Sequence, residues 1–478
     1  MNEKYRPQIH FSPKTSWMND PNGLIYHEGT YHLFFQYYPD DIVWGPMHWG
    51  HATSKDLVHW KEQPIALYPD SLGYIFSGSA VMDWKNTSGL GTPDNPPMVA
   101  IFTYHDPKGE KEKTSDFQTQ GIAYSLDKGI SWKKYDKNPV LKNPGIPDFR
   151  DPKVIWIPKY EKWIMALAVK DHISFYSSNN LIDWDFESDF EVAFSKEQGV
   201  WECPDLFPLT DSEGNKKWVL IVSVNTKGLQ GGSGTQYFVG DFDGQNFIPD
   251  DVSLRWLDQG ADNYAGVTFS DIPKTDGRRI LIGWMSNWQY AQEVPTEEWR
   301  SAMTLARSLH LFKDQKGSYQ LQSKPVDELF ALHLEESVST FSNQIETESD
   351  TYKITFKNIS QEPLQCVIKN SLGEYCKITL ENDTLRFDRK ESGVTDFEEN
   401  FASVHTFSYE DISLHQLDIY VDRSSIEIFL NDGQKVMTEI VFPEKPYQII
   451  NVKATDVKAT LTPLHSIWKT EGVERTDN

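Results

Sequence analysis

Hydrophobic positions along the chain occur in short runs and not in long helical patterns. Five apolar runs of five residues each follow one another, and their starts are separated by 67, 65, 55 and 62 residues. They are residues 31–35, 98–102, 163–167, 218–222 and 280–284. Turn residues bound each run, as is typical of β-strands. The sequence therefore predicts a β-rich protein with a repeat of about 60 residues.

A second pattern follows each of the first four runs. It is a hairpin with a polar turn and a second strand that opens on an aromatic residue, at residues 51–60, 122–132, 175–184 and 237–247. In the second and third hairpins, Ser125 and Ser177 each stand seven residues before the tryptophan. Repeats of this length are typical of a β-propeller. We predict an all-β fold that begins with a five-bladed β-propeller.

The pattern changes beyond the fifth run. From about residue 341, short strands alternate hydrophobic and polar positions, and Asn431-Asp432-Gly433 predicts a hairpin turn between two of them. This pattern favours a C-terminal β-sandwich. We expect a propeller domain over residues 1–328, a linker over residues 329–340 and a sandwich domain over residues 341–478.

Composition also indicates two domains with different roles. The 478 residues include 16 tryptophans, and 15 of them lie between Trp17 and Trp299. Packing between blades accounts for most of these rings. The formal net charge of −24 argues against nucleic acid and anionic membranes as partners, because both would be repelled. The absence of a run of 18 apolar residues predicts no transmembrane helix.

The cysteines and the start of the chain bear on the compartment. Cys203, Cys366 and Cys376 are too few for a disulfide-stapled scaffold, and we expect free thiols, although Cys366 and Cys376 could pair. The first residues lack the apolar core of a signal peptide. We expect a cytoplasmic protein if the chain is complete as written, and an extracellular or periplasmic one if a leader was removed.

Three acidic residues occupy equivalent places in three repeats. Asp20, Asp151 and Glu202 are each followed by proline within two residues, and then by a short strand, a turn and the apolar run. The first strand of a propeller blade lines the central funnel, so the three carboxylates should meet near the axis. Carboxylates that share a pocket raise the pKa of at least one of them. This supplies the protonated acid and the ionised partner that glycoside hydrolysis needs.

A metal site is another use for three acidic side chains. The nearest clustered histidines, His48 and His51, are expected in the outer part of the first blade. We therefore predict no metal ion and no cofactor.

Three motifs resemble the signatures of glycoside hydrolase family 32, the invertase, inulinase and levanase family: WMNDPNG at residues 17–23, FRDP at 149–152 and ECP at 202–204. Further stretches match at residues 44–51, 76–80, 283–288 and 423–429, so the resemblance covers nearly the whole chain. It implies a retaining double displacement. Asp20 would be the nucleophile, Glu202 the acid/base and Asp151 the stabiliser of the transition state.

The resemblance also implies a set of substrate-binding residues. The positions that match those of the family's fructose pocket are Trp17, Asn19, Gln36, Trp44, Phe76, Ser77, Arg150 and Trp288. Flat aromatic faces suit the apolar faces of sugars, and Arg150 could keep the neighbouring Asp151 ionised. One departure is Asn263, which stands where related sequences often carry phenylalanine and is expected near the pocket mouth.

The activity that the resemblance implies is that of an exo-β-fructosidase acting on inulin- and levan-type fructans, fructo-oligosaccharides and sucrose. An invertase or a sucrose-6-phosphate hydrolase is the first alternative, although the sequence lacks a basic cluster for a phosphate. An inverting five-bladed arabinosidase or xylosidase and a non-catalytic sugar-binding propeller are further alternatives. The expected partners are sugars and fructan chains, with no nucleic acid and no membrane. The sandwich would brace the propeller or form a homo-oligomer interface.

Overall fold

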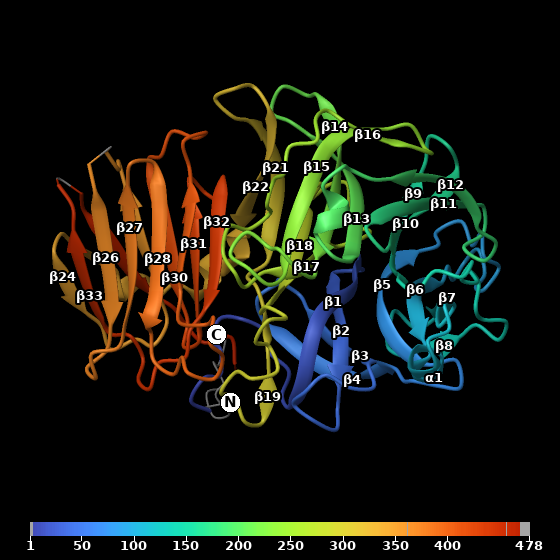
Figure 1. Ribbon diagram of the computed structural model, residues 1–478, viewed down its shortest axis with the longest axis horizontal. Helices are drawn as coiled ribbons and strands as arrows, with labels where there is room; N and C mark the ends of the chain where they lie inside the picture. Colours follow the sequence, from blue (N-terminus) through green and yellow to red (C-terminus); the bar gives the residue numbers. More distant parts are fainter. Residues whose placement is uncertain (1–2, 361, 456, 469–478) are drawn as a thin grey trace, which may run out of the picture.

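The computed structural model describes residues 3–360, 362–455 and 457–468. Within these ranges the chain consists mainly of strands, which form two units side by side (Figure 1). The described strands of the first unit form a ring of five sheets, and those of the second form two six-stranded sheets. The first unit is a five-bladed β-propeller and the second is a β-sandwich, so the predicted fold class is confirmed.

Each blade is an antiparallel sheet whose main strands follow one another in sequence. Blade 1 contains β1 (Ser16–His27), β2 (Thr30–Tyr38), β3 (His48–Ser54) and β4 (Trp60–Leu67). Blade 2 contains β5 (Tyr74–Met82), β6 (Met98–His105), β7 (Gln118–Ser125) and β8 (Lys133–Lys134). Blade 3 contains β9 (Phe149–Ile157), β10 (Lys162–Val169), β11 (His172–Ser178) and β12 (Asp185–Phe190).

The remaining blades complete the ring. Blade 4 contains β13 (Trp201–Thr210), β14 (Lys216–Val224), β15 (Gly234–Phe242) and β16 (Phe247–Pro249). Blade 5 contains β17 (Tyr264–Thr268), β18 (Arg279–Met285), β20 (Ala302–Met303), β21 (Arg307–Lys313) and β22 (Tyr319–Pro325). The first strands β1, β5, β9, β13 and β17 contact one another around the axis. Strand β19 (Trp299–Arg300) closes the ring, because it leaves the fifth repeat and pairs in parallel with β1.

The five apolar runs are parts of the second strands of the blades. Strand β6 is buried at every position, and β10 is buried at all but its first. A blade lies between two neighbours, so both faces of its inner strands are covered and a continuous apolar run results. The sandwich strand β26 (Leu364–Lys369) instead alternates buried and half-buried positions, as expected of a sheet with one face towards a core.

The recurring hairpins join the third and fourth strands of the first four blades. Trp60, Trp132 and Trp184 each donate the indole N–H to the carbonyl three residues earlier, at 3.0, 3.2 and 3.1 Å. The tryptophan spacing thus reflects a turn that the indole closes. In blade 3 the turn serine is Ser178, whose Oγ accepts a turn N–H, whereas Ser177 donates to a neighbouring strand. The spacing drawn from Ser177 is therefore wrong by one residue.

Little helix is present in the described part of the chain. One α-helix, α1 (Pro107–Glu112), lies between β6 and β7, and its first turn is capped by the side chain of Asp106. The 3-10 turns are Ser195–Glu197, Asp327–Leu332 and Glu335–Ser337. None of the helices in the described ranges is long and apolar enough to cross a membrane. The last two of these turns overlap the linker predicted over residues 329–340. The boundaries of that linker remain a prediction.

The sandwich consists of two facing sheets. One contains β23 (Ser339–Phe341), β34 (Ala459–Pro463), β25 (Tyr352–Lys357), β30 (Gln416–Val421), β31 (Ser425–Leu430) and β32 (Lys435–Ile440). The other contains β24 (Gln344–Glu346), β33 (Ile449–Lys453), β26, β27 (Tyr375–Glu381), β28 (Thr384–Glu391) and β29 (Val404–Ser408). The predicted turn at Asn431-Asp432-Gly433 joins β31 to β32, with positive φ at all three residues. All three cysteines are buried and free.

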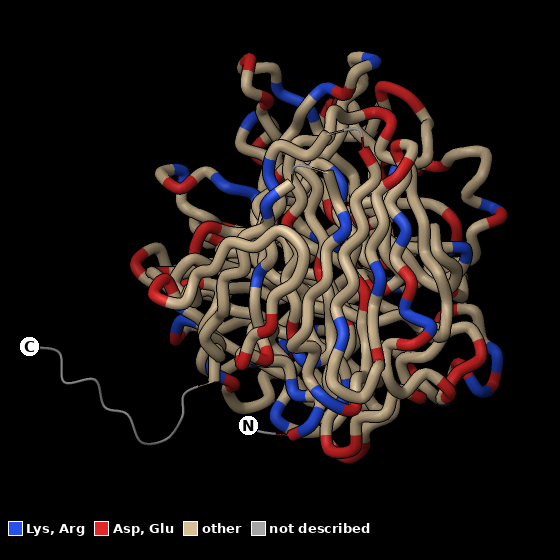
Figure 2. Tube along the Cα trace, turned by 90° about the vertical axis from the view of Figure 1, so that its left-hand side faces the viewer, with Lys and Arg blue, Asp and Glu red and all other residues tan. Residues whose placement is uncertain are grey.

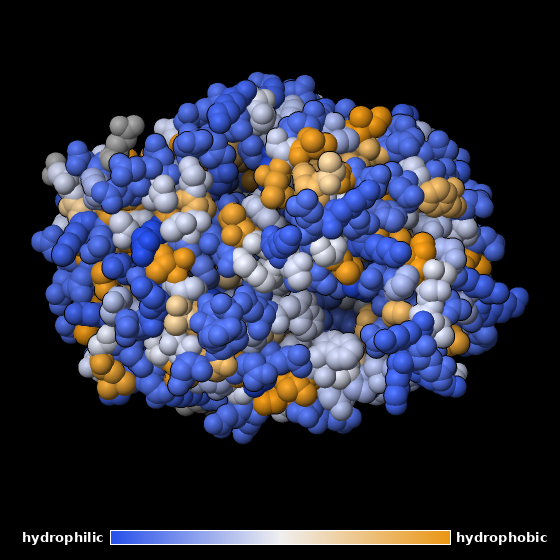
Figure 3. All heavy atoms as spheres, viewed as in Figure 1, coloured by the Kyte–Doolittle hydropathy of each residue, from blue (hydrophilic) through white to orange (hydrophobic). Residues whose placement is uncertain are grey.

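On the surface, charged side chains of both signs are mixed, whereas between the two units they are buried as ion pairs. Acidic and basic residues are interspersed over the sandwich end of the molecule (Figure 2), and hydrophobic side chains are scattered over a mostly hydrophilic face (Figure 3).

Between the units, the guanidinium of Arg307 on β21 donates to Asp258 at 2.9 Å and to Glu427 on β31 at 2.6 Å. Arg389 on β28 makes a similar buried contact with Asp262 at 2.8 Å. Charges buried this deeply must be paired, so these pairs fix how the sandwich sits on the propeller.

We expect Arg307→Met to lower the free energy of unfolding by about 3–5 kcal/mol, because Asp258 would stay buried without its cation and Glu427 would keep only His10 as an ion-pair partner. Urea denaturation followed by fluorescence would measure the change. The matched control is Lys316→Met, which breaks an ion pair with Glu410 between side chains that are 74% and 70% exposed. The control should cost less than about 1 kcal/mol. Equal losses in the two variants would contradict a special contribution of Arg307.

Candidate active site

Every first strand of the propeller carries an irregularity at an equivalent place. The pairing with the second strand shifts at residues 18–21 in β1, 75–78 in β5, 150–153 in β9, 202–205 in β13 and 264–267 in β17. Such β-bulges re-aim side chains and are common beside active sites. Asp20, Asp151 and Glu202 lie on three of them. The proline that follows each acid suits a bulge, because proline has no N–H to give to the ladder.

The backbone is strained at two of the three bulges that carry an acid. Asp151 has a φ of 64° and Cys203 a φ of 45°, a region that side chains other than glycine adopt at a cost. Hydrogen bonds hold both residues there. The N–H of Asp151 donates to Thr103 Oγ1 at 2.9 Å, and the N–H of Cys203 donates to Asp151 Oδ2 at 3.0 Å. These two hydrogen bonds thus link blades 2, 3 and 4 near the axis.

The three predicted carboxylates meet around the thiol of Cys203. The Sγ atom lies 3.3 Å from Asp20 Oδ2 and 3.6 Å from Asp151 Oδ2. Glu202 is the residue before Cys203 on β13 and lines the same cavity as the two aspartates. The structure therefore brings together the acids that the repeat spacing selected. Burial and the three nearby carboxylates raise the pKa of the Cys203 thiol well above its usual value.

Asp20 is buried and surrounded by hydrogen-bond donors. Its Oδ2 accepts from Ser77 Oγ at 2.6 Å, and its Oδ1 accepts from Asn19 Nδ2 at 3.0 Å. The indole N–H of Trp17 donates to Asn19 Oδ1 at 2.8 Å and so fixes the orientation of that amide. Burial raises the pKa of Asp20, the Ser77 hydrogen bond opposes this, and the charge of Glu202 adds to it.

Glu202 is held by one cation and one hydroxyl. Arg150 donates to Glu202 Oε1 through Nη2 at 2.8 Å and through Nε at 3.3 Å, while the Tyr264 hydroxyl donates to Oε2. Asp148 accepts from Nη1 of the same arginine at 2.6 Å. Burial would lower the pKa of Arg150, but Glu202, Asp151 and Asp148 raise it, so the guanidinium stays charged.

The pKa of Asp151 is also raised. Burial raises the pKa of its carboxyl to about 7, Arg150 opposes the shift, and the charges of Glu202 and Asp20 increase it. The sequence-based expectation that Arg150 favours the ionised form is correct in direction, but burial outweighs it. The carboxyl of Asp151 therefore holds its proton to a higher pH than an exposed aspartate does.

A cavity of about 400 Å³ lies over the carboxylates. Its wall includes seven of the eight predicted binding residues: Asn19, Gln36, Trp44, Phe76, Ser77, Arg150 and Trp288. The eighth, Trp17, is fully buried and lies behind the wall, where its ring stacks on Trp288 at 6.0 Å between centroids. Two further rings, Trp44 and Phe76, meet edge to face at 6.0 Å. The cavity thus combines carboxylates with aromatic walls.

Sequence reasoning missed several residues of this cavity: His105, Glu110, Phe117, Gln118, Asp148, Asn225 and Gln292. Asp148 could have been found, because it stands two residues before Arg150 and alternate residues of an extended chain share a face. The expected place of Asn263 at the pocket mouth is wrong. Its side chain is buried, donates to Asp258 at 3.1 Å and does not line the cavity.

The clustered histidines lie outside the cavity. His51 is buried against His32, with 3.1 Å between ring nitrogens, and neither His51 nor His48 lines the cavity. The described residues contain no group of three or more histidine, cysteine, aspartate and glutamate side chains arranged to hold a metal ion.

Comparison with known proteins places this cavity in a family context. The chain matches the model for the N-terminal domain of glycosyl hydrolases family 32 over residues 10–325, and the model for the C-terminal domain over residues 320–469. A levanase of Bacillus subtilis is 45% identical over 493 residues, which cover 98% of this chain and 72% of the levanase. An extracellular exo-inulinase of Aspergillus niger is 38% identical over 517 residues, covering 98% and 96%.

A solved structure agrees with these relatives. The crystal structure of an exo-inulinase from Aspergillus awamori superposes with a TM-score of 0.90 at 35% sequence identity. The superposition covers 98% of this chain and 99% of that one.

The raised pKa of Asp151 predicts a pH-dependent stability. Aspartate in an unfolded chain titrates near pH ~4, so between about pH 4 and 7 the folded state binds the extra proton. This contribution to stability is complete at low pH and is lost as the pH rises through about 7. Asp151→Asn keeps the shape without the charge. Between pH 5 and 8 we expect the free energy of unfolding of the wild type to fall by about 2–3 kcal/mol more than that of Asp151→Asn.

Urea denaturation at the two pH values would measure this difference. The control is Asp136→Asn, which neutralises a side chain that is 79% exposed and should leave the pH dependence of the wild type unchanged. If Asp151→Asn and the wild type lost stability in parallel, the proton would reside on another group.

Proposed function

The chain belongs to glycosyl hydrolase family 32, and we propose that it is a retaining exo-β-fructosidase. It would release terminal β-D-fructofuranosyl residues from inulin- and levan-type fructans, fructo-oligosaccharides and sucrose. The meeting of Asp20, Asp151 and Glu202 in one aromatic-walled cavity supports this function most directly. The substrate class is supported by relatives named levanase and exo-inulinase.

Asp20 is the proposed nucleophile. The hydrogen bonds from Ser77 and Asn19 favour its ionised form against burial and fix both oxygens. Attack of one oxygen on the anomeric carbon C2 forms a bond from Asp20 to the fructosyl unit while the bond to the leaving oxygen breaks. Water then displaces Asp20 from C2, so that two inversions give retention.

Glu202 is the proposed acid and base. Its proton passes to the leaving oxygen in the first step, and its carboxylate takes a proton from water in the second. Arg150 and Tyr264 both donate to it, so the carboxylate formed by the first transfer is stabilised where it stands.

Asp151 is the proposed stabiliser of the transition state. It lines the cavity beside Asp20, and its Oδ2 is anchored by the N–H of Cys203. Its other oxygen is then available to accept hydrogen bonds from fructose hydroxyls. Such bonds strengthen as positive charge develops on the sugar ring, which lowers the barrier. Trp44, Phe76 and Trp288 supply the apolar surface for the sugar.

The geometry also bears on the alternatives. An inverting hydrolase places a water between its base and the sugar and needs widely separated carboxylates. Here Asp20 and Glu202 line one cavity, and the charge of Glu202 raises the pKa of Asp20, which supports a close pair. A phosphorylated substrate needs a free cation. Arg150 is the one lysine or arginine among the described residues lining the cavity, and carboxylates already occupy it. Association through the sandwich stays a prediction.

A product time course tests the proposed function. On inulin and on levan we expect fructose as the sole product at every time, and on sucrose equal amounts of glucose and fructose. Anion-exchange chromatography of timed samples would measure this. Asp20→Ala, purified in parallel, should release nothing and so exclude a contaminating glycosidase. Early mixtures of oligosaccharides would show endo-action and overturn the exo assignment.

The role of Glu202 has a separate test. For Glu202→Gln we expect kcat/KM on sucrose to fall by about 10³-fold or more, because the proton donor is lost. On a nitrophenyl β-fructofuranoside, whose leaving group needs no proton, the loss should be at least about tenfold smaller. The paired variant Asp20→Asn should lose activity on both substrates alike. Equal losses for Glu202→Gln on the two substrates would rule out the acid role.

A further inference from the structure

A second cavity, of about 500 Å³, lies at the other end of the propeller axis. Along β9, Asp151 lines the first cavity and residues 153–156 line the second. Along β13, Glu202 lines the first and residues 205–206 line the second. Strand β5 shows the same order. Since three first strands run past both cavities in the same direction, the cavities lie at opposite ends of the propeller axis.

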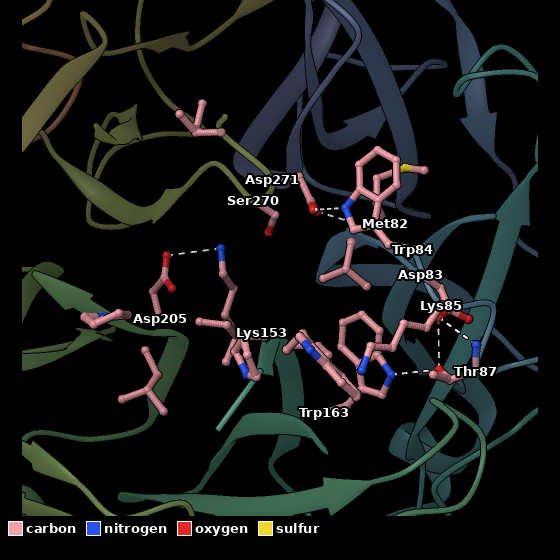
Figure 4. Close-up of a pocket in the computed structure, with 18 of the residues that line it drawn as sticks. Met82, Asp83, Trp84, Lys85, Thr87, Lys153, Trp163, Asp205, Ser270 and Asp271 are labelled. Carbon is pink, nitrogen blue, oxygen red and sulfur yellow. Dashed lines mark hydrogen bonds and ion pairs between the residues drawn. The ribbon is translucent and has the colours of Figure 1, made fainter. Parts of the chain in front are cut away.

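The floor of the second cavity is polar. Lys153 Nζ lies 3.1 Å from Asp205 Oδ2 and donates to the carbonyl of Thr268 at 2.6 Å (Figure 4). Thr268 in turn donates to Asp205 Oδ2 through its N–H and its hydroxyl, at 2.6 and 2.8 Å. The other oxygen, Asp205 Oδ1, is buried and accepts no hydrogen bond from any described residue. The floor of the cavity therefore contains a hydrogen-bond acceptor, Asp205 Oδ1, that has no donor among the described residues.

A guanidinium on the wall has donors to spare. Arg279 packs over the ring of Phe207, and the one hydrogen bond recorded for it among the described residues goes from Nη1 to the carbonyl of Phe269 at 3.3 Å. No carboxylate of the described residues lies within ion-pair distance of it. A charged group in such a place is stabilised by acceptors that a ligand brings.

The mouth of the cavity presents a fixed aromatic ring. Trp84 is 57% exposed, and its indole N–H donates to Asp271 Oδ1 at 2.8 Å, so the ring is held in place while its surface stays open (Figure 4). Trp156 and Ile272 add apolar wall nearby. A large exposed indole with a fixed orientation is a ready contact for the apolar face of a sugar ring.

The charges of the lining indicate a neutral ligand. Four cationic side chains and three carboxylates line the cavity: Lys85, Lys153, Lys274, Arg279, Asp83, Asp205 and Asp271. Donors and acceptors thus stand side by side with little net charge, which matches hydroxyl groups because each hydroxyl both donates and accepts. A volume of about 500 Å³ is in the usual range for small-molecule sites.

We propose that this second cavity is a non-catalytic saccharide-binding site, and that its ligand is a short stretch of fructan. The fructan identity rests on the proposed function, whereas the saccharide class rests on the lining residues. Because the two cavities lie at opposite ends of the propeller axis, one short oligosaccharide cannot fill both. The second site therefore holds the enzyme on polymeric material and raises the local concentration of chain ends.

Titration calorimetry in a chain without turnover tests the proposal. In Asp20→Ala, an inulin-type trisaccharide should bind at two sites per chain. Adding Trp84→Ala should weaken binding at the second site at least about tenfold, so that one site remains. The thermal unfolding midpoint should be the same as that of Asp20→Ala alone. The matched control adds Phe186→Ala, which removes a ring that is 56% exposed and lies outside both cavities, and should leave two sites. One site in all three chains would overturn the proposal.

Two further titrations separate the proposal from the proposed function. If fructans are not hydrolysed but maltotriose or xylotriose fills a site that Trp84→Ala empties, the saccharide site stands and its fructan identity falls. If inorganic phosphate binds, the trisaccharide does not, and Arg279→Gln abolishes the phosphate binding, the cavity is an anion site and the saccharide proposal is wrong.

Discussion

Closure of five sheets around one axis is the constraint on which the rest of this structure depends. The ring brings five first strands within contact of one another, so whatever side chains they carry at one depth must share a small volume. At that depth every strand bulges, and three of the bulges carry Asp20, Asp151 and Glu202. Burial and mutual repulsion then follow from the architecture, and the donors around each acid decide which form it takes.

The sequence was sufficient where a pattern has one physical cause. Inner strands buried on both faces must be apolar, so the five runs marked the blades. Sandwich strands such as β26 alternate because one of their faces meets water. The three acids were found because equivalent positions in the repeats occupy equivalent places in the blades. Residues such as Glu110 on α1 and Gln292 reach the cavity from segments between strands, where chain direction depends on tertiary packing. The shift from Ser177 to Ser178 shows how a turn of variable length defeats a fixed spacing.

The sandwich contributes to the propeller through charge pairing as well as apolar contact. Arg307 and Arg389 are each buried between acids of the two units, so moving one unit against the other would strand charges away from water. Asp258 and Asp262, which accept these arginines, stand just before β17, whose first residue, Tyr264, touches Glu202. The sandwich therefore fixes the segment that leads to the contact with Glu202 in the candidate active site.

The cysteine between the aspartates has a chemical consequence. Thiols are attacked by alkylating agents and peroxides as thiolates, and the Cys203 proton is held by burial and by the negative charges around it. The acids that we propose to perform the chemistry thus also hold the Cys203 sulfur in its thiol form, which is the less reactive one. We therefore expect Cys203 to react slowly with oxidants and thiol reagents because of the charges around it, with no separate shield around the site.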